Sequence, residues 1–424
     1  MSVRETQRGR LVEKCHMCKN DFLVPVLDLG LQPHSDHFPT EEQLKKKDEE
    51  RYPLELVFCS GENGCGLLQI NYLVNPKTLY QTDYLYQSLS TTKTGGAHFE
   101  NLAREICRDF SIPEHALAVD IGSNVGFLLQ CFKNEGLRVQ GVDPAEEMAR
   151  TAGRSGIPTI VDFFNKDVAE HIIERNGGTA HVITGTNVFA HIHDLDGAVS
   201  GMKELLADDG VIVIEAPYAR DLIEHMEYDT IYHSHIGYLA VQPMERYFRQ
   251  MGLELFALKK SDMHGGSLQY YVGHMGRHSI SADIDRYIQE EVEYGLYDYN
   301  RLKEFADDVL KQKDELIEHL MKLKKEGKRI AGISAPAKGN TLLNYCGIDE
   351  NVLDFITEKN PLKIGRYTPG TRIPIHGDEK LLEEQPDYAL ILAWNFSKEI
   401  MKNLEEYKKR GGKFIIPIPQ PMIL

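Results

Sequence analysis

One short segment constrains the fold more than any other: an apolar stretch that runs directly into a glycine-rich turn. Residues 117–121 read Leu-Ala-Val-Asp-Ile, and Gly122 and Gly126 follow. Glycine lets the backbone turn sharply and approach a ligand closely, and a helix that begins at such a turn offers unpaired N–H groups. The segment therefore predicts a buried strand, a ligand-binding turn and a helix.

The middle of the chain continues this alternation of short apolar runs and amphipathic segments. Strands are predicted at residues 117–121, 138–142, 181–184 and 211–215. The helices predicted between them cover residues 125–134, 145–152 and 195–206. Such alternation predicts a parallel sheet covered by helices on both faces. Segments 253–258 and 267–273 follow without a helix between them, as expected of a closing antiparallel pair.

The last third of the chain repeats the alternation after a charged, proline-free segment. Residues 279–326 place apolar side chains at helical spacing, which predicts one or two long helices. A second series of strands and helices is then predicted at residues 329–333, 340–345, 353–356, 388–392, 399–408 and 414–416. The two α/β series share no obvious repeat in their residues.

The 424 residues exceed what one ordinary core organises, so we expect three domains. The predicted boundaries are 1–80 for a metal-binding head, 81–278 for the first α/β domain, and 279–424 for linker helices plus a second α/β domain. Within the head, the charged run from Glu41 to Arg51 is interpreted as a solvated helix or loop.

The net charge of -16 argues against nucleic acid as a partner, because binding phosphate backbones needs a basic face. The first residues lack the apolar run of a signal peptide, and no stretch reaches the roughly 18 apolar residues of a membrane span. We therefore expect a cytoplasmic protein with no membrane partner, acting on a small molecule as a monomer or weak homo-oligomer.

The spacing within the glycine-rich turn indicates the kind of ligand. The motif reads Asp120-x-Gly122-x-x-x-Gly126. Its spacing differs from the dinucleotide fingerprint Gly-x-Gly-x-x-Gly, because Ser123 and Asn124 follow Gly122. This pattern suits a ligand with a carboxypropyl-amine tail and no pyrophosphate. Asp143 ends the next predicted strand, 23 residues after Asp120, where a carboxylate can take both hydroxyls of a ribose.

Pro144, beside that carboxylate, and Asn187, at the end of a later strand, complete the expected cofactor site. Asn187 begins a segment that also contains His191, at the carboxyl edge where open α/β sheets bind ligands. His191 is equally well interpreted as an active-site residue or as a packing residue.

A dense aromatic run follows between residues 228 and 238, with three tyrosines and two histidines. Histidine can act as a base near neutral pH, and a tyrosine hydroxyl can stabilise an oxyanion. Further along, His264-Gly265-Gly266-Ser267 precedes a strand, and a simple hairpin turn explains it as well as a functional site does. Lys338, between a strand and a helix, could hold a phosphate, although most such loops carry no ligand.

Four of the seven cysteines lie in the first 65 residues, as Cys15-x-x-Cys18 and Cys59-x5-Cys65. Two such pairs about 40 residues apart can wrap one tetrahedral zinc ion. The second pair is wider than the usual spacing of two to four residues, and unligated thiols are the alternative. Cys107, Cys131 and Cys346 are interpreted as core residues.

Taken in order, these segments resemble the C-methyltransferases that act on nucleotide-activated 4-keto deoxysugars. The resemblance spans nearly the whole chain. Besides the cysteine pairs and the glycine-rich turn, it rests on residues 187–194, Glu215-Ala216-Pro217-Tyr218, Tyr232-His233-x-His235, His264-Gly265-Gly266-Ser267 and Ala335-Pro336-Ala337-Lys338-Gly339-Asn340.

The resemblance implies a methyltransferase core of Rossmann-like fold, an N-terminal zinc-binding domain and a C-terminal Rossmann-like domain, with S-adenosylmethionine and zinc as cofactors. It implies that His235 removes the sugar C3 proton and that the enolate takes the methyl group. Tyr232, His191 and Tyr86 match positions that bind or polarise the ketone, and Ser234 lies among them. His264, Lys338 and Asn340 match positions toward the nucleotide-sugar.

Two positions depart from the family pattern. The family has an acid where this chain has Ser234, and it tends to have a basic residue where this chain has Gln269. These departures and the widened cysteine pair suggest a divergent branch of the family. They bear on which sugar is the substrate more than on whether a methyl group is transferred. Three alternatives stay open: O- or N-methylation of a small molecule, a catalytically degenerate cofactor- or sugar-binding protein, and an RNA methyltransferase, against which the charge argues.

Overall fold

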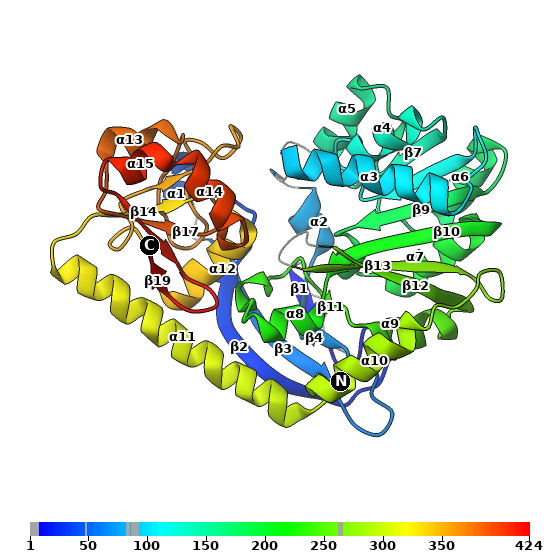
Figure 1. The fold of residues 1–424 in the computed structure, drawn as a ribbon, viewed down its shortest axis with the longest axis horizontal. Coiled ribbons are helices and arrows are strands. Elements are labelled where there is room, and N and C mark those ends of the chain that lie inside the picture. The colour runs from blue at the N-terminus through cyan, green and yellow to red at the C-terminus, as the bar shows by residue number, and fades with distance from the viewer. Residues whose placement is uncertain (1–7, 47–48, 82–84, 86–92, 262–265) are drawn as a thin grey trace.

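The computed structural model describes residues 8–46, 49–81, 85, 93–261 and 266–424. Their strands form a two-stranded pair and sheets of four, seven and six strands. In Figure 1 the six-stranded sheet and its helices lie on one side and the seven-stranded sheet on the other, with the N-terminal strands between and below them. One continuous cluster of buried apolar side chains joins the three parts, with members such as Leu54, Ile214 and Leu343.

The seven-stranded sheet has the order β12-β13-β10-β9-β6-β7-β8, parallel except for β13, which runs antiparallel to both of its neighbours. Its strands are β6 (Leu117–Ile121), β7 (Arg138–Val142), β8 (Thr159–Ile160), β9 (Ala180–Thr186), β10 (Leu206–Pro217), β12 (Leu253–Ser261) and β13 (Ser267–His274). All five residues of β6 are buried, because helices cover both faces of the sheet. The predicted parallel sheet and its closing antiparallel pair are therefore confirmed.

The helices and short turns around this sheet are α3 (Lys93–Asp109), α4 (Phe127–Asn134), α5 (Glu146–Arg154), α6 (Lys166–Asn176), η2 (Phe189–His191), α7 (Leu195–Leu205), α8 (Ala219–Glu224), η3 (Tyr228–Thr230) and α9 (Val241–Gln250). Helices α4, α5 and α7 lie where the sequence predicts them, with ends shifted by one or two residues. Helices α3, α6, α8 and α9 were not predicted. Helix α3 begins with Lys-Thr-Gly-Gly, and glycine lowers helix propensity.

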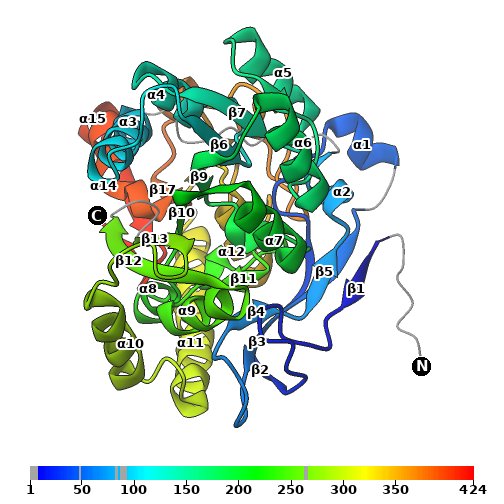
Figure 2. The ribbon, with the colours of Figure 1, turned by 90° about the vertical axis from the view of Figure 1, so that its right-hand side faces the viewer.

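The N-terminal part is mostly strand. Its elements are β1 (Gly9–Leu11), β2 (Leu23–Pro33), α1 (Glu41–Lys46), β3 (Arg51–Cys59), β4 (Leu68–Ile70), β5 (Tyr72–Val74) and α2 (Pro76–Tyr80). The four-stranded sheet has the order β11-β4-β3-β2, and β11 (Gly237–Tyr238) comes from the middle of the chain (Figure 2). Helix α1 buries none of its residues, as expected of the charged run.

The six-stranded sheet has the order β16-β15-β14-β17-β18-β19 and is parallel apart from β19. Its elements are β14 (Ile330–Ile333), α12 (Ala337–Cys346), β15 (Ile356–Thr357), β16 (Ile375–His376), α13 (Glu379–Glu384), β17 (Tyr388–Ile391), η5 (Trp394–Phe396), α14 (Ser397–Asn403), α15 (Glu405–Lys409), β18 (Lys413–Ile416) and β19 (Met422–Ile423). The second α/β series is thereby confirmed.

Two predicted elements of that series are wrong in their extent. The strand predicted from residue 353 begins at Ile356, because Val352 and Leu353 turn back to hydrogen-bond the Asp349 carbonyl while remaining buried. The helix predicted over residues 399–408 breaks at Leu404, whose backbone leaves the helical region. The apolar periodicity continues across the break, so the sequence pattern could not reveal it.

The segment predicted as one or two long helices forms two, α10 (Asp283–Tyr294) and α11 (Tyr299–Lys325). Helix α11 runs along the lower edge of the molecule from the seven-stranded part to the six-stranded part (Figure 1). No helix within the described ranges is long and apolar enough to cross a membrane.

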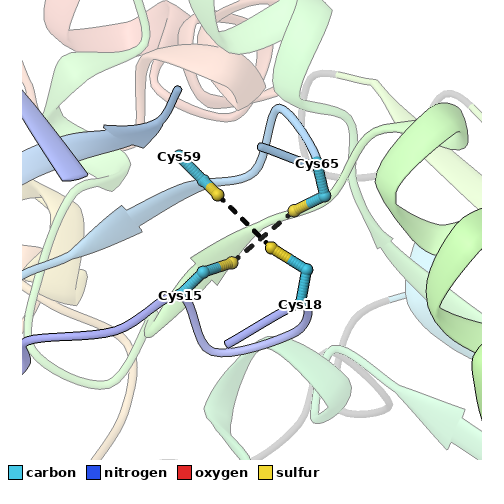
Figure 3. A group of neighbouring side chains, drawn as sticks. All are labelled: Cys15, Cys18, Cys59 and Cys65. Atoms are coloured by element: carbon cyan, nitrogen blue, oxygen red, sulfur yellow. Dashed lines mark hydrogen bonds between the residues drawn. The ribbon is translucent and has the colours of Figure 1, made fainter. Parts of the chain in front are cut away.

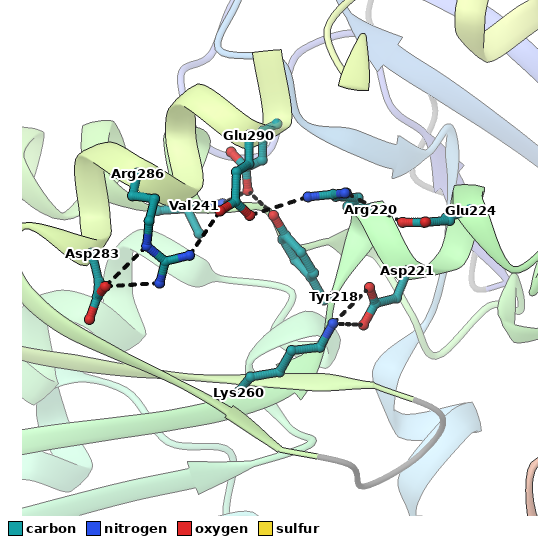
Figure 4. A network of polar contacts seen from close by, with 10 residues as sticks. Tyr218, Arg220, Asp221, Glu224, Val241, Lys260, Asp283, Arg286 and Glu290 are labelled. Atoms are coloured by element: carbon teal, nitrogen blue, oxygen red, sulfur yellow. Dashed lines mark hydrogen bonds and ion pairs between the residues drawn. The ribbon is translucent and has the colours of Figure 1, made fainter. Parts of the chain in front are cut away.

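A buried carboxylate fastens α10 to the seven-stranded part. Glu291 is fully buried, and its oxygens accept hydrogen bonds from the Tyr218 hydroxyl (2.9 Å), from the backbone N–H groups of Val241 (2.6 Å) and Gln242 (3.1 Å), and from the Tyr297 hydroxyl. The two backbone donors begin α9, so Glu291 caps that helix from a distance. Exposed ion pairs, such as Arg286 with Glu290, surround this contact (Figure 4).

We expect Glu291→Ala to lower the free energy of unfolding by about 3 kcal/mol, because it leaves several buried donors without an acceptor. Chemical denaturation of the purified chain measures this change. The matched control is Glu290→Gln, which removes only partly exposed ion pairs and should cost less than about 1 kcal/mol. Equal losses for the two variants would contradict the bridging role of Glu291.

Candidate active site and metal centre

A cavity of about 900 Å³ opens at the carboxyl ends of β6, β7, β9 and β10. Its walls come from all three parts of the chain. The N-terminal part contributes Asp36 and Tyr80, and the middle part contributes the glycine-rich turn and the 232–235 segment. The C-terminal part contributes the loop that holds Lys338. A volume of this size accommodates a nucleoside-sized ligand and leaves space for a second molecule.

The glycine-rich turn has the close-approach geometry that its sequence predicts. Gly122 has φ 69°, and a Cβ there would lie 2.7 Å from Val188 Cγ2. Asn124 is also left-handed, with φ 49°. Gly122, Ser123 and Asn124 line the cavity, and the buried Ser123 Oγ has no hydrogen-bond partner in the described part of the chain. Gly126 lies just behind them, where it begins α4 and packs against Ile157.

Asp143 stands at the end of β7 with acceptor positions open toward the cavity. One oxygen accepts the Asn124 N–H (2.8 Å) and the other accepts the Ala145 N–H (2.8 Å). A carboxylate offers about four acceptor positions, so each oxygen retains one for a ligand hydroxyl. Burial raises the pKa of Asp143, whereas the two N–H groups lower it. This arrangement fits a ribose diol.

Asp120 faces the same region from the end of β6. Its Oδ1 accepts a hydrogen bond from the Thr184 hydroxyl at 2.6 Å, and burial raises its pKa to about 7. Pro144 and Asn187 also line this half of the cavity. Asn187 has φ 55°, and its N–H donates to the Glu215 carbonyl at 2.7 Å, which fixes the chain after β9. The structure therefore brings the predicted cofactor residues together at one sheet edge.

His235 is the ring in the aromatic run that faces the cavity with a defined tautomer. Its Nδ1 lies 2.9 Å from the Thr230 carbonyl, so Nδ1 carries the proton. In the neutral ring, Nε2 is then the acceptor for the Tyr232 hydroxyl, which lies 2.8 Å away. The other histidine of the run, His233, points away and contacts the Pro53 carbonyl at 3.2 Å. A neutral imidazole with an accepting Nε2 is the form a general base requires.

His191 packs beside His235, with ring centroids 4.9 Å apart. Burial and the neighbouring His235 hold the pKa of His191 well below its usual value, so His191 is neutral at pH 7. On its other side, His191 stacks on Tyr80 at 6.2 Å. His191, Tyr232, Ser234 and His235 all line the cavity. Tyr86 and His264 lie outside the described residues.

The C-terminal wall supplies Lys338 but not Asn340. Lys338 contacts the Asn395 side chain and lies over the Trp394 ring, 4.1 Å from its centroid. Burial lowers its pKa, which the carboxylates of Asp229 and Glu227 oppose. Asn340 does not line the cavity, because it lies two residues after Lys338 on α12 and two residues along a helix face opposite sides. Its Nδ2 donates to the Ser35 carbonyl at 2.7 Å.

Several cavity residues had no signal in the sequence. His98 on α3 pairs with the fully buried Glu215 at 2.9 Å, and Gln269 donates to the other oxygen of Glu215 at 2.6 Å. Gln269, the departure from the family pattern, therefore serves a buried carboxylate beside the cofactor half. Asp36 and Lys363, from distant parts of the chain, line the half of the cavity opposite the predicted cofactor residues. Only the pairing of these segments in three dimensions reveals them.

The four N-terminal cysteines converge on one point (Figure 3). Their sulfur atoms all lie within 4.8 Å of one another, and the Cys15–Cys65 and Cys18–Cys59 pairs are 3.5 Å apart. A tetrahedral zinc site with Zn–S bonds of 2.3 Å separates its sulfurs by about 3.8 Å. The sulfurs are too far apart for disulfides, so this donor set fits zinc.

The metal centre supports the active site through its neighbours in the chain. His16, inside the first cysteine pair, contacts the Ile192 carbonyl through Nε2 at 2.8 Å. Ile192 directly follows His191. The Ile236 N–H donates to the Ala190 carbonyl at 2.7 Å, and the Ile70 N–H donates to the Ile236 carbonyl at 3.0 Å. The sheet that carries the cysteine cluster is thus continuous with the segments that carry the two cavity histidines, His191 and His235.

The fold and the site together define an S-adenosylmethionine-dependent methyltransferase with a zinc-binding head, and three family models agree. They match a zinc binding domain over residues 15–80, a methyltransferase domain over residues 97–258 and a C-methyltransferase C-terminal domain over residues 262–419.

Two solved structures are similar to part of this chain. The match to an S-adenosylmethionine-dependent methyltransferase of Clostridium acetobutylicum covers 44% of this chain and 96% of the relative, with 12% identity and a TM-score of 0.34. The match to the magnesium protoporphyrin IX methyltransferase of Synechocystis covers 42% of this chain and 78% of the relative, with 12% identity and a TM-score of 0.32. The C-methyltransferase NovU of Streptomyces niveus is 32% identical over 416 residues, covering 98% of this chain and 97% of that protein. This chain belongs to the C-methyltransferase family.

We expect the purified protein to contain one zinc ion per chain, and Cys18→Ser to lose it. Elemental analysis measures the metal content, and denaturation should show a loss of at least about 2 kcal/mol, because the knuckles lose their cross-link. The control is Cys107→Ser, a half-buried cysteine on α3 outside the cluster. A wild-type protein that is metal-free after purification with zinc present would contradict the assignment.

For the cofactor half, we expect Asp143→Asn to weaken S-adenosylmethionine binding by about 10- to 100-fold, because the amide presents a donor where the backbone N–H groups and the ribose need acceptors. Isothermal titration calorimetry measures the affinity. Asp209→Asn, at the exposed opposite end of the sheet, should leave it unchanged. An unaltered affinity in Asp143→Asn would exclude the ribose contact.

Proposed function

We propose that this protein transfers a methyl group from S-adenosylmethionine to C3 of a nucleotide-activated 4-keto deoxysugar, with His235 as the general base. The observation that carries the proposal is the Tyr232–His235–Thr230 arrangement. It directs Nδ1 of the imidazole to a carbonyl and Nε2 to the Tyr232 hydroxyl, inside a cavity that Asp143 and Lys338 also line. NovU, named a C-methyltransferase, supports attack by carbon.

His235 is proposed to remove the C3 proton. The electron pair of the C3–H bond moves toward the C4 carbonyl and forms an enolate, while Nε2 takes the proton. The Tyr232 hydroxyl, which donates to Nε2 in the absence of substrate, turns to the ketone oxygen and frees Nε2. A donor placed where charge develops stabilises the enolate. The Thr230 carbonyl holds the imidazolium by accepting from Nδ1.

When bound, S-adenosylmethionine supplies an electrophilic methyl group, and C3 forms the new C–C bond as the C–S bond breaks. The chain's own residues align the reactants and keep the site dry. Neutral His191, packed against His235, avoids a second positive charge beside the imidazolium. Lys338 and the N-terminus of α12 are proposed to bind the substrate diphosphate.

Incubation with the cofactor and a panel of nucleotide-linked 4-keto-6-deoxysugars tests the proposal. A sugar methylated at C3 is the expected product, identified by mass spectrometry and NMR. In deuterated water without cofactor, the C3 proton should exchange, which O- or N-methylation does not require. The absence of any methylated sugar across the panel would overturn the proposed function.

We expect His235→Gln to reduce turnover by at least about 100-fold, because the amide cannot accept the C3 proton. Tyr232→Phe keeps the ring contact with His235 but removes the donor to the enolate, so its turnover should fall by a similar or smaller factor. Both should lose C3 exchange in deuterated water, while calorimetry shows unchanged cofactor affinity. The control His319→Gln alters an exposed histidine on α11. Retained exchange in His235→Gln would assign the base elsewhere.

A further inference from the structure

The loop between β2 and α1 brings an acidic side chain into the cavity. Asp36 lines the cavity and is only 9% exposed. Its carboxylate has no hydrogen-bond partner within the described ranges. Its neighbours Ser35 and Phe38 are buried as well. Burying a carboxylate without a partner is costly, so such a group needs a reason to be there.

The C-terminal part of the chain holds this loop in place. The Asn340 side chain donates to the Ser35 carbonyl at 2.7 Å, and Arg366 donates to the Phe38 carbonyl at 2.9 Å. The Tyr367 N–H donates to the Pro39 carbonyl at 3.0 Å. The backbone of Asp36 is therefore fixed from both sides. Asn340, which does not line the cavity, acts as a positioning residue for this loop.

Asp36 belongs to the wall that carries the active-site rings. The Tyr80 hydroxyl lies near both Ser234 and Asp36: burial raises its pKa most, the Ser234 side chain lowers it, and the Asp36 carboxylate raises it. Tyr80 also stacks on His191, which packs against His235. Through these contacts the carboxylate and the general base lie on connected surfaces of one cavity.

One cation lies close enough to act on this carboxylate. Lys363 opposes the rise that burial causes in the pKa of Asp36. The lysine is itself engaged, because its Nζ donates to the Ala335 carbonyl at 2.7 Å and lies 4.4 Å from the centroid of the Phe38 ring. Lys363 thus favours the charged form of Asp36 against the effect of burial, while the acceptor positions of the carboxylate stay open to the cavity.

We propose that Asp36 binds the sugar ring of the substrate: its carboxylate accepts a hydrogen bond from a ring hydroxyl or amino group and so holds C3 within reach of His235. The proposal rests on the proposed function and deepens it. It assigns a sugar-binding carboxylate to a chain that has Ser234 where the family has an acid. Because Lys338 and the N-terminus of α12 are proposed to bind the diphosphate, Asp36 should affect binding of the sugar and not of the nucleoside diphosphate.

The test compares two ligands on the zinc-loaded full chain: the 4-keto sugar nucleotide that the wild type methylates fastest, and the nucleoside diphosphate released from it. Asp36→Asn should weaken calorimetric binding of the sugar nucleotide by about tenfold or more, because a charged acceptor is lost. Its KM should rise in parallel. Affinity for the diphosphate and for S-adenosylmethionine, and the zinc content, should stay within twofold.

Asp21→Asn, at an exposed aspartate of the same N-terminal part, is the matched control and should bind both ligands as the wild type does. A second variant moves the charge across the wall. Ser234→Glu in the Asp36→Asn background should recover much of the lost affinity for the sugar, because both positions lie near the Tyr80 hydroxyl in the same cavity. Ser234→Glu alone should weaken binding, since it places two carboxylates close together.

Unchanged affinity for the sugar nucleotide in Asp36→Asn would overturn the assignment of Asp36 and leave the proposed function intact. Equal losses for the sugar nucleotide and the diphosphate would also overturn it, because they would show a disturbed fold instead of a lost sugar contact. Failure of the wild type to methylate any 4-keto sugar would overturn the proposed function itself, and that result is seen without any variant.

Discussion

The Tyr232–His235 segment has no long helix or strand of its own, so its position depends on the pairing of β11 with β4. Gly237 and Tyr238 join the edge of the N-terminal sheet, opposite Gln69 and Leu68. That sheet also carries Cys59 at the end of β3, and the four cysteines close its loops. The four-cysteine cluster, which does not line the cavity, therefore helps to fix the position of His235, the proposed base, because a short strand has few contacts of its own. The zinc-binding head is in this sense part of the active site.

The two α/β parts use the same device at the end of their second strand. Asp143 follows β7 and accepts the N–H groups of Asn124 and Ala145. Glu358 follows β15 and accepts the N–H groups of Ala335 (2.8 Å), Lys359 (2.7 Å) and Asn360 (3.0 Å). In each case a carboxylate orders the loop after the first strand, and both carboxylates line the one cavity. The loops of both sheets thus face each other with their ligand-binding edges preformed.

Much of this could be predicted from local sequence, and the failures share one cause. The turn from Asp120 to Gly126, the Asp143 carboxylate and the cysteine pairs depend on spacing within a few residues, which a sequence displays directly. The contribution of Asp36 depends on a loop held by α12, some 300 residues away, and nothing near Asp36 signals it. Asn340 was placed by family pattern alone, and its helical position turns it to the side opposite Lys338. Pairings between distant segments are the information that a single sequence lacks.

Positive and negative side chains alternate on the C-terminal wall of the cavity. Lys338, Lys359 and Lys363 line this wall together with Glu358, Asp378 and Glu399. Burying Lys338 costs solvation, and the nearby carboxylates of Glu227 and Asp229 offset that cost. Burial in turn raises the pKa of Glu227 to about 8 and that of Asp229 to about 6, while Lys338 lowers both. Each buried charge is tolerable because the others are present, so the charge of this wall is a property of the cluster and not of any single lysine. Local electrostatics of this kind, more than net charge, decide which ligand the cavity accepts.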